Sequence, residues 1–363
     1  MRGITFWAYK RAHFCSEKKL IILVRYVIHC NVKIYIIYFD KLLLGINSIS
    51  FLKNYSNMKK KYNFAYTAGY FDGDACFECS KGFDKRDNRF YYRIRIRVVS
   101  TNKKILVFFQ EIFGGNINLT KGHYRNQKWK YQYCYSICGI KAFNLIEKII
   151  PYLVEKKEEA KILFSFFQTN DNNKKNLLIE KLKNLKKFEN LIKIEHKKKL
   201  QTIKNTIQST KENFAYFAGL IDAEGCFKTS TYKGSTKILL CCNNSKILIF
   251  KWIISRFGGN IYFVNRSKAN NKHRDQFYWY LSSKSLFSII NNIYPFLQYK
   301  KTVCKKLIQI HNLNFSVGGD RQSKSFTKKF YQVQNKKLKL IEQVHHLNLK
   351  GITSELPRNN IFS

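Results

Sequence analysis

Acidic side chains are scarce in this chain. Its 363 residues include 23 Asp and Glu against 66 Lys and Arg, which gives a formal net charge of +43. Such an excess is typical of proteins that bind a polyanion, with nucleic acid favoured over an anionic membrane surface. Proline is also rare, and 3 prolines with 17 glycines exclude collagen-like and Pro-rich linker proteins. With 45% hydrophobic and 16% aromatic residues, the chain is not intrinsically disordered, and its length allows two or three domains.

Long apolar runs and paired metal-binding cysteines are missing too. The most apolar stretch near the start, residues 20–39, is interrupted by an arginine, a histidine and a lysine, so we expect no membrane span. Of ten cysteines, only Cys76 and Cys79 have C-x-x-C spacing, and a zinc site would need a second such pair. We therefore expect free thiols in a reducing compartment. The abundant Lys, Asn, Ile, Phe and Tyr, written with A/T-rich codons, indicate an organelle genome, with the chloroplast slightly favoured over the mitochondrion.

The chain contains an internal repeat. NFAYTAGYFDGDACF at 63–77 returns as NFAYFAGLIDAEGCF at 213–227, with nine of fifteen positions identical and an offset of 150. FGGNI at 113–117 returns at 257–261, and the Pro-bearing IPYL at 150–153 returns as YPFL at 294–297, both at an offset of 144. The preserved order predicts two copies of a unit of roughly 100 residues that pack about a local two-fold axis.

Each copy opens with a helix that has a small residue at every fourth position. Such a stripe lets two helix backbones approach closely, and a helix-interior glycine costs about 1 kcal/mol relative to alanine, so it needs a packing reason. We expect the facing repeat to supply it. The predicted interface residues are Ala65, Gly69 and Gly73 in the first copy and Ala215, Gly219 and Ala223 in the second.

Strands with alternating polar and apolar residues follow each helix. In RIRIRV at 93–98 the arginines alternate with aliphatic residues, and KWKYQY at 128–133 and QFYWYL at 276–281 alternate similarly. A solvated sheet face is one explanation, but three arginines in register on so basic a chain favour a DNA-facing surface. The predicted DNA-binding residues are Arg93, Arg95, Arg97, Lys128, Lys130, Gln132 and Gln276.

The repeats predict an α+β fold with helix, two hairpins and closing helices in each unit. We expect residues 1–57 to be an N-terminal extension outside the folded core, since they match neither repeat and Met58 is the only methionine after Met1. The first repeat should span 58–165 and the second 211–312. A basic helical linker at 166–210 would join them, and a basic segment at 313–363 would follow, with nucleic-acid contact by either left open.

The two repeated helices resemble the LAGLIDADG motif of homing endonucleases. TAGYFDGDA at 67–75 and FAGLIDAEG at 217–225 both carry it, and the resemblance covers about residues 63–312. Two motifs, each followed by FGGNI and a Pro-bearing helix, are similar to the single-chain, two-repeat branch of that family. The resemblance implies two antiparallel, saddle-shaped sheets over the DNA major groove.

The acids that end the two motifs, Asp74 and Glu224, are the candidate catalytic and metal-binding residues. A carboxylate at a helix C-terminus opposes the macrodipole, and two that meet near the two-fold axis would be relieved by a divalent ion such as Mg²⁺. The family pattern implies a structural role for Asp72 and Asp222 in the helix interface. It also places a lysine near the scissile phosphates, which makes Lys156 and Lys300 further candidate catalytic residues.

Ala75 departs from the motif, because the family has glycine there, as Gly225 does in the second repeat. We expect this position to need the left-handed conformation, at a cost of about 1 to 2 kcal/mol for alanine. The first repeat would then be the less active half.

The resulting functional hypothesis is a monomeric, magnesium-dependent homing endonuclease. It would make a double-strand break with short 3′ overhangs at a long asymmetric site in an intronless allele, with no membrane partner. The alternatives are an intron maturase that binds its own intron RNA on the same scaffold and a catalytically inactive DNA-binding protein.

Overall fold

The computed structural model describes residues 20–28, 31–39, 48–120, 131–188, 208–232, 235–264, 275–282, 285–313 and 324–349. The chain divides into two compact units, Met1–Met58 and Lys59–Ser363. The first unit contains an antiparallel pair of strands, β1 (Leu20–Ile28) and β2 (Asn31–Phe39). The division lies one residue beyond the extension expected at 1–57. Among the described residues, no helix combines the length and hydrophobicity that crossing a membrane requires.

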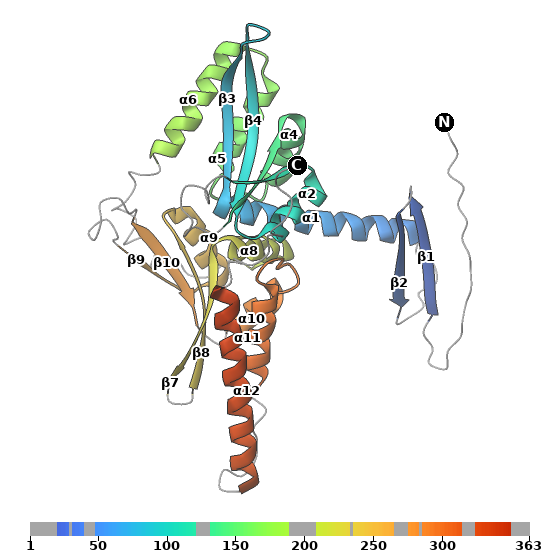
Figure 1. The fold of residues 1–363 in the computed structure, drawn as a ribbon, viewed down its shortest axis with the longest axis vertical. Coiled ribbons are helices and arrows are strands. Elements are labelled where there is room, and N and C mark those ends of the chain that lie inside the picture. Colours follow the sequence, from blue (N-terminus) through green and yellow to red (C-terminus); the bar gives the residue numbers. More distant parts are fainter. Residues whose placement is uncertain are drawn as a thin grey trace, which may run out of the picture. The chain divides into compact units, whose positions relative to one another are not determined.

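The two repeats have the same element order along the chain (Figure 1). The first repeat consists of α1 (Ser48–Asp74), β3 (Ala75–Asp84), β4 (Arg89–Ser100), α2 (Lys103–Phe113), β5 (Asn116–Leu119), β6 (Tyr133–Cys138), α4 (Gly139–Ile149), α5 (Lys157–Gln168) and α6 (Asn172–Phe188). The second consists of α8 (Lys211–Glu224), β7 (Gly225–Tyr232), β8 (Ser235–Asn244), α9 (Ile247–Phe257), β9 (Asn260–Val264), β10 (Gln276–Leu281), α10 (Ser285–Ile293), α11 (Lys301–Leu313) and α12 (Lys324–Leu349).

Each repeat contains a four-stranded antiparallel sheet, in the order β3-β4-β6-β5 or β7-β8-β10-β9. The α+β class and the hairpins are as predicted. A helix that the sequence analysis did not predict, α2 or α9, separates the two hairpins. In α2 the side chain of Asn102 caps the first turn, Ile105, Leu106 and Phe109 are buried, and Gly114 ends the helix with a φ of 75°. The repeated FGG is therefore a helix end followed by a strand.

The two basic helices outside the predicted repeat boundaries pack on the repeats themselves. Helix α6 lies against α5 and the edge strand β3, and Lys186 Nζ donates to the Phe77 carbonyl (2.6 Å). Helix α12 lies against α11 and the edge strand β7, and Asn348 Nδ2 donates to the Phe227 carbonyl (2.8 Å). Both helices cover equivalent edges, since Phe77 and Phe227 are equivalent positions. The predicted linker 166–210 and basic segment 313–363 thus each contribute a helix to a repeat, and the predicted boundary at 165 falls inside α5.

The repeats meet where α1 and α8 pack with their backbones almost in contact. A Cβ atom added to Gly69 would lie 1.9 Å from the Tyr216 carbonyl oxygen, and one added to Gly219 would lie 1.9 Å from the Tyr66 carbonyl oxygen. One turn on, a Cβ added to Gly73 would lie 2.6 Å from the Ala223 Cβ atom. Ala65 and Ala215 are fully buried. The equal distances on both sides show that the contact follows a local two-fold axis.

The substitution Gly69→Ala should therefore destabilise the protein strongly. Its methyl group meets a backbone carbonyl, which can move only if the two helices separate, and overpacking of this kind costs about 3 kcal/mol or more. Gly82→Ala is a matched control, because its Cβ would meet the half-exposed ring of Tyr91 rather than a backbone. Urea unfolding of both variants gives the comparison. Equal losses of stability would contradict the proposed packing.

Candidate active site and nucleic-acid interface

The two motif acids lie at the C-terminal ends of the two packed helices. Asp74 is the last residue of α1, and Glu224 is the last residue of α8. A Cβ atom added to Gly73 would lie 3.0 Å from the Glu224 Cγ atom, so the acid-bearing helix ends meet at the repeat interface. Strands β3 and β7 begin at the next residue after each acid. The helix packing therefore brings together two carboxylates from residues 150 positions apart.

The prediction for Ala75 is wrong. Among the described residues, Asn88 is the non-glycine residue with a positive φ, so Ala75 is not left-handed. Gly225 is extended as well, with φ −77° and ψ 154°, because the chain passes directly from the helix into a strand. Alanine carries no backbone penalty here, and the argument that the first repeat is less active no longer holds.

Asp72 and Asp222 link the repeats through hydrogen bonds that follow the same two-fold axis. Asp72 accepts from the Tyr216 hydroxyl (2.6 Å) of the other repeat and from the backbone N–H groups of Val154 (2.7 Å) and Lys156 (2.8 Å). Asp222 accepts correspondingly from the Tyr66 hydroxyl (2.7 Å) and from the N–H groups of Gln298 (2.7 Å), Tyr299 (3.0 Å) and Lys300 (2.7 Å). Both aspartates are buried. Each aspartate therefore ties the start of the next helix, α5 or α11, to the repeat interface.

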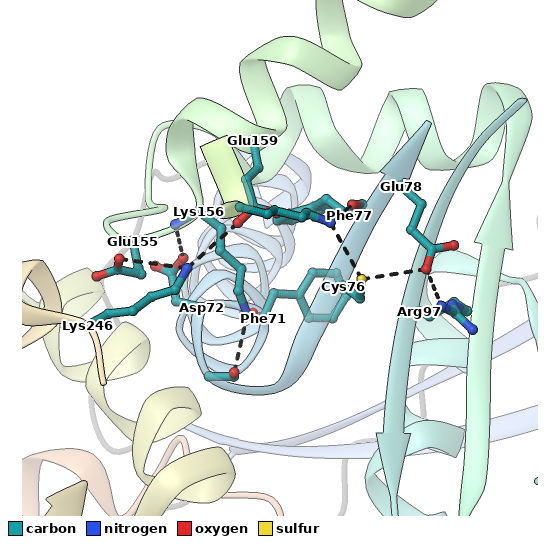
Figure 2. A network of polar contacts seen from close by, with 12 residues as sticks. Phe71, Asp72, Cys76, Phe77, Glu78, Arg97, Glu155, Lys156, Glu159 and Lys246 are labelled. Carbon is teal, nitrogen blue, oxygen red and sulfur yellow. Dashed lines mark hydrogen bonds and ion pairs between the residues drawn. The ribbon is translucent and has the colours of Figure 1, made fainter. Parts of the chain in front are cut away.

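The side chains of Lys156 and Lys300 contact the backbone carbonyls at the C-terminal ends of the motif helices α1 and α8. Lys156 Nζ donates to the carbonyl oxygens of Phe71 (2.8 Å) and Gly73 (3.2 Å), as Figure 2 shows for Phe71. Lys300 Nζ donates to the carbonyl oxygens of Ile221 (2.7 Å) and Asp222 (2.9 Å). The last carbonyls of a helix generally lack partners within it, although the Ile221 carbonyl also accepts from the Gly225 N–H. A cation at this end also opposes the negative end of the macrodipole. Burial lowers the pKa of both lysines. In this structure both amines cap helices instead of reaching into solvent.

The two acids hold their protons more tightly than ordinary carboxyls. Desolvation by the surrounding protein and then the charge of Asp74 raise the pKa of Glu224 to about 7, against the charges of Lys156 and Lys300. Desolvation also raises the pKa of Asp74. The residue as a whole is exposed, but protein atoms surround its carboxyl group. Both lysines and a hydrogen bond with Tyr70 limit that rise. Tyr70 is Leu220 in the second repeat, so Glu224 lacks this hydrogen bond.

This donor set suits a hard divalent cation. Two carboxylates of which one raises the pKa of the other gain from a dication between them. Mg²⁺ typically takes one or two carboxylates and completes its shell with water and phosphate oxygens. In the part of the chain that the structure describes, no three His, Cys, Asp or Glu side chains gather as a ligand group. Any ion at Asp74 and Glu224 would therefore keep positions open for such oxygens.

The arginine row of the first sheet has the predicted alternation. Ile94, Ile96 and Val98 of β4 are buried, while Arg93 is exposed and Arg95 and Arg97 are half-buried on the opposite face. Glu78 of β3, which the sequence analysis missed, forms ion pairs with both Arg95 and Arg97. Gln132 is exposed just before β6, whereas Lys128 and Lys130 lie outside the described residues.

The corresponding face of the second sheet carries the exposed lysines Lys228 and Lys237 but, in its described strands, no arginine. Its β10 strand presents Gln276, Tyr278 and Tyr280 on the face opposite the buried Phe277 and Trp279. Tyr278 pairs with Asn243 of β8 and with Tyr262 of β9, whose side chain is 49% exposed. Gln276 thus lies on this outer face, as predicted, among aromatic rather than basic neighbours.

A second contact joins the repeats and differs between its two copies. Lys246, just before α9, lies 3.8 Å from Glu155 Oε1 and 3.7 Å from Glu159 Oε1 of the first repeat, and Figure 2 shows it facing both acids. At the equivalent place, Asn102 hydrogen-bonds to Tyr299. Both contacts join the residue before α2 or α9 to the segment at the start of α5 or α11 in the other repeat.

Tyr66 and Tyr216 are further site residues that the sequence analysis missed. Both are fully buried, and burial followed by the facing aspartate raises the pKa of each hydroxyl well above its ordinary value. The sequence could have indicated both tyrosines, because the NFAY segment that contains them is identical in the two repeats. Glu78 was harder to identify from the sequence, because its position opposite Arg95 can be assigned only when the hairpin register is known.

Comparison with known proteins identifies similar sequences and folds. The model of the LAGLIDADG endonuclease family matches residues 67–161. The structure of I-SmaMI bound to an uncleaved DNA target in the presence of calcium ions is similar over 78% of this chain and 99% of that one, with 14% identity and a TM-score of 0.51. The LAGLIDADG homing endonuclease I-GzeII in complex with its DNA target aligns over 75% of this chain and 97% of that one, with 14% identity and a TM-score of 0.49. No curated protein sequence matches.

The raised pKa of Glu224 predicts a pH-dependent effect of Glu224→Gln on stability. In the unfolded chain this carboxyl loses its proton near pH 4.5, whereas in the folded chain it keeps the proton to about pH 7. The folded state binds more protons in that window, so the stability of the wild type falls as pH rises from 4.5 to 7. Glutamine cannot ionise. The variant should melt like the wild type at pH 5 and higher by about 2 to 5 °C at pH 8.

The exposed Glu111→Gln on α2 serves as the control for this measurement. It should show the same difference from the wild type at both pH values. A Glu224→Gln variant whose melting temperature differs equally from the wild type at pH 5 and pH 8 would contradict the crowding of the two acids.

Proposed function

We propose that the chain, whose residues 67–161 match the model of the LAGLIDADG endonuclease family, belongs to that family and is a site-specific DNA endonuclease. The proposed reaction is metal-dependent hydrolysis of one phosphodiester in each strand, which gives a double-strand break. The substrate is duplex DNA with a long asymmetric target, as the two unlike sheet faces suggest. A net charge of +43 supplies the attraction to the phosphate backbone.

The observation that carries this proposal is the pair of motif acids at the helix contact. Asp74 and Glu224 come from equivalent positions, meet at the local two-fold axis and share the charges of Lys156 and Lys300. A local two-fold axis suits a duplex, whose strands are also related by two-fold symmetry. One carboxylate can then serve each strand.

Six side chains of this centre have roles in the proposed reaction. Asp74 and Glu224 would hold the divalent ion, which when bound would polarise a phosphoryl oxygen and lower the pKa of a bound water. Lys156 and Lys300 are positioning residues: their amines brace the helix ends, and their charges favour the ionised acids. Asp72 and Asp222 hold the backbone of those lysines in place.

The pair of acids favours a nuclease over the two alternatives. An intron maturase and an inactive DNA-binding protein need the sheet surfaces. Neither needs two carboxylates held so close that the pKa of Glu224 is raised. A role in splicing its own intron RNA stays compatible with the same scaffold. We also propose that the protein acts as a monomer, since both halves of the site lie in one chain. The composition favours work in an organelle, with the chloroplast slightly favoured over the mitochondrion.

Neutralising the acids should abolish cleavage and spare binding. Asp74→Asn and Glu224→Gln keep the side-chain shape and remove a negative charge that repels phosphate, so affinity for DNA should stay the same or rise slightly. The target is first found by digesting a library of randomised duplexes with Mg²⁺ and sequencing the break points. A supercoiled plasmid that carries it is then incubated with each variant and scored for nicked and linear circles.

The double variant should give neither product, and each single variant should give mainly nicked circles, because each acid serves one strand. Glu147→Gln, an exposed acid on α4, is the control and should cut like the wild type. Linear product at the wild-type rate from the double variant would overturn the assignment.

A further inference from the structure

The outer face of the first sheet holds an acid between two arginines. In the hairpin register Glu78 lies directly opposite Arg95, and Cys76 lies opposite Arg97, so Glu78 is the diagonal neighbour of Arg97. Glu78 Oε2 accepts from Arg95 Nε (2.9 Å) and Nη2 (2.8 Å), and Oε1 accepts from Arg97 Nη2. Figure 2 shows the carboxylate of Glu78 turned toward Arg97. One carboxylate thus holds two guanidinium groups.

These bonds keep Glu78 charged. Partial burial alone would raise its pKa, but hydrogen bonds from Arg97 and Arg95 and their charges outweigh that effect and lower the pKa below its ordinary value. The arginines stay accessible, since 36% of the Arg95 side chain and 41% of the Arg97 side chain are exposed. Each guanidinium has five N–H donors, and the bonds to Glu78 use two on Arg95 and one on Arg97. Donors remain for a ligand on the outer face.

An acid at this place weakens attraction to phosphate. The chain has 23 acids against 66 basic residues, and a carboxylate in the middle of a DNA-facing surface repels the backbone. Its benefit is orientation: a guanidinium already held in place loses less conformational freedom when it binds. An arginine aimed in this way binds the O6 and N7 atoms of guanine through two hydrogen bonds. Neighbouring outward residues on a strand are about 6.8 Å apart, close to the rise of two base pairs.

The second sheet has different chemistry at the equivalent positions. Lys228 stands at the offset of 150 from Glu78, opposite Leu239, and Cys226 stands opposite Cys241 where the first repeat has Cys76 and Arg97. Lys228 Nζ donates to the Tyr278 hydroxyl (3.4 Å). Within the described strands β7 to β10, this sheet has no arginine. Apolar and hydroxyl groups suit thymine methyl groups and phosphates more than guanine.

We propose that Glu78 determines specificity by aiming Arg95 and Arg97 together at guanines in the half of the target bound by the first repeat. The half bound by the second repeat has no such guanine contact and is read mainly through apolar and hydroxyl groups. This inference rests on the proposed DNA endonuclease function. It predicts a target with two guanines within about two base pairs of each other in one half.

The test is selection of bound duplexes from a randomised pool by the full-length protein with Ca²⁺, followed by sequencing. The wild type should enrich an asymmetric site with these guanines. Arg95→Ala should relax the preference for guanine at one position, which identifies the half of the target that the first repeat binds. Glu78→Gln should reduce discrimination of guanine over adenine at both positions by about 10-fold, while total binding stays the same or rises. Its melting temperature should stay near that of the wild type, since partly exposed ion pairs contribute little to stability.

Lys228→Gln is the matched control from the second repeat. It should weaken binding to all sequences and leave the guanine preference unchanged. The slope of log affinity against log salt concentration should fall in magnitude by about one. A Glu78→Gln variant that keeps the guanine preference within about 2-fold would overturn the inference while leaving the endonuclease proposal intact. A pool in which no sequence is enriched would overturn both.

Discussion

The close approach of α1 and α8 is the constraint on which the rest of the structure depends. At Gly69 and Gly219 the carbonyl oxygen of the facing helix occupies the place where a Cβ atom would otherwise lie. Only at this separation do the last residues of both helices come close enough for the charge of Asp74 to raise the pKa of Glu224. The strands that carry the sheet faces begin at the next residues. The helix contact therefore sets the position of the acids and the starting point of both sheets.

Asp72 and Asp222 convert that contact into a fixed arrangement of charge. Each binds a tyrosine of the opposite repeat and the backbone before the following helix, and the lysine at that point turns back to the carbonyls of the motif helix. Buried polar groups that are fully hydrogen-bonded favour one arrangement over its alternatives. The result is a centre in which two acids and two lysines are held by the same bonds that hold the repeats together.

Much of what was predicted from the sequence occurs twice, although the repeated helices α2 and α9 and the repeated Tyr66 and Tyr216 were missed. The motif helices, the glycine stripe and the acids at the helix ends are all repeated, so comparison of the copies exposed them. Features that depend on register or differ between copies were missed. Glu78 has Lys228 as its counterpart, and the charged contact of Lys246 with Glu155 and Glu159 has a neutral counterpart in Asn102 and Tyr299. The error at Ala75 has another cause: a glycine after a helix usually indicates a left-handed cap, but here the chain continues directly into a strand.

The helix contact brings Asp74 and Glu224 together as one charged centre. Titration of the Glu224 carboxyl by ¹³C NMR in the full-length protein, with and without the substitution Asp74→Asn, measures this coupling. We expect a pKa of about 7 for Glu224 in the wild type and a lower pKa once Asp74 is neutral. A Glu224 carboxyl that titrates near its ordinary value in both proteins would contradict it.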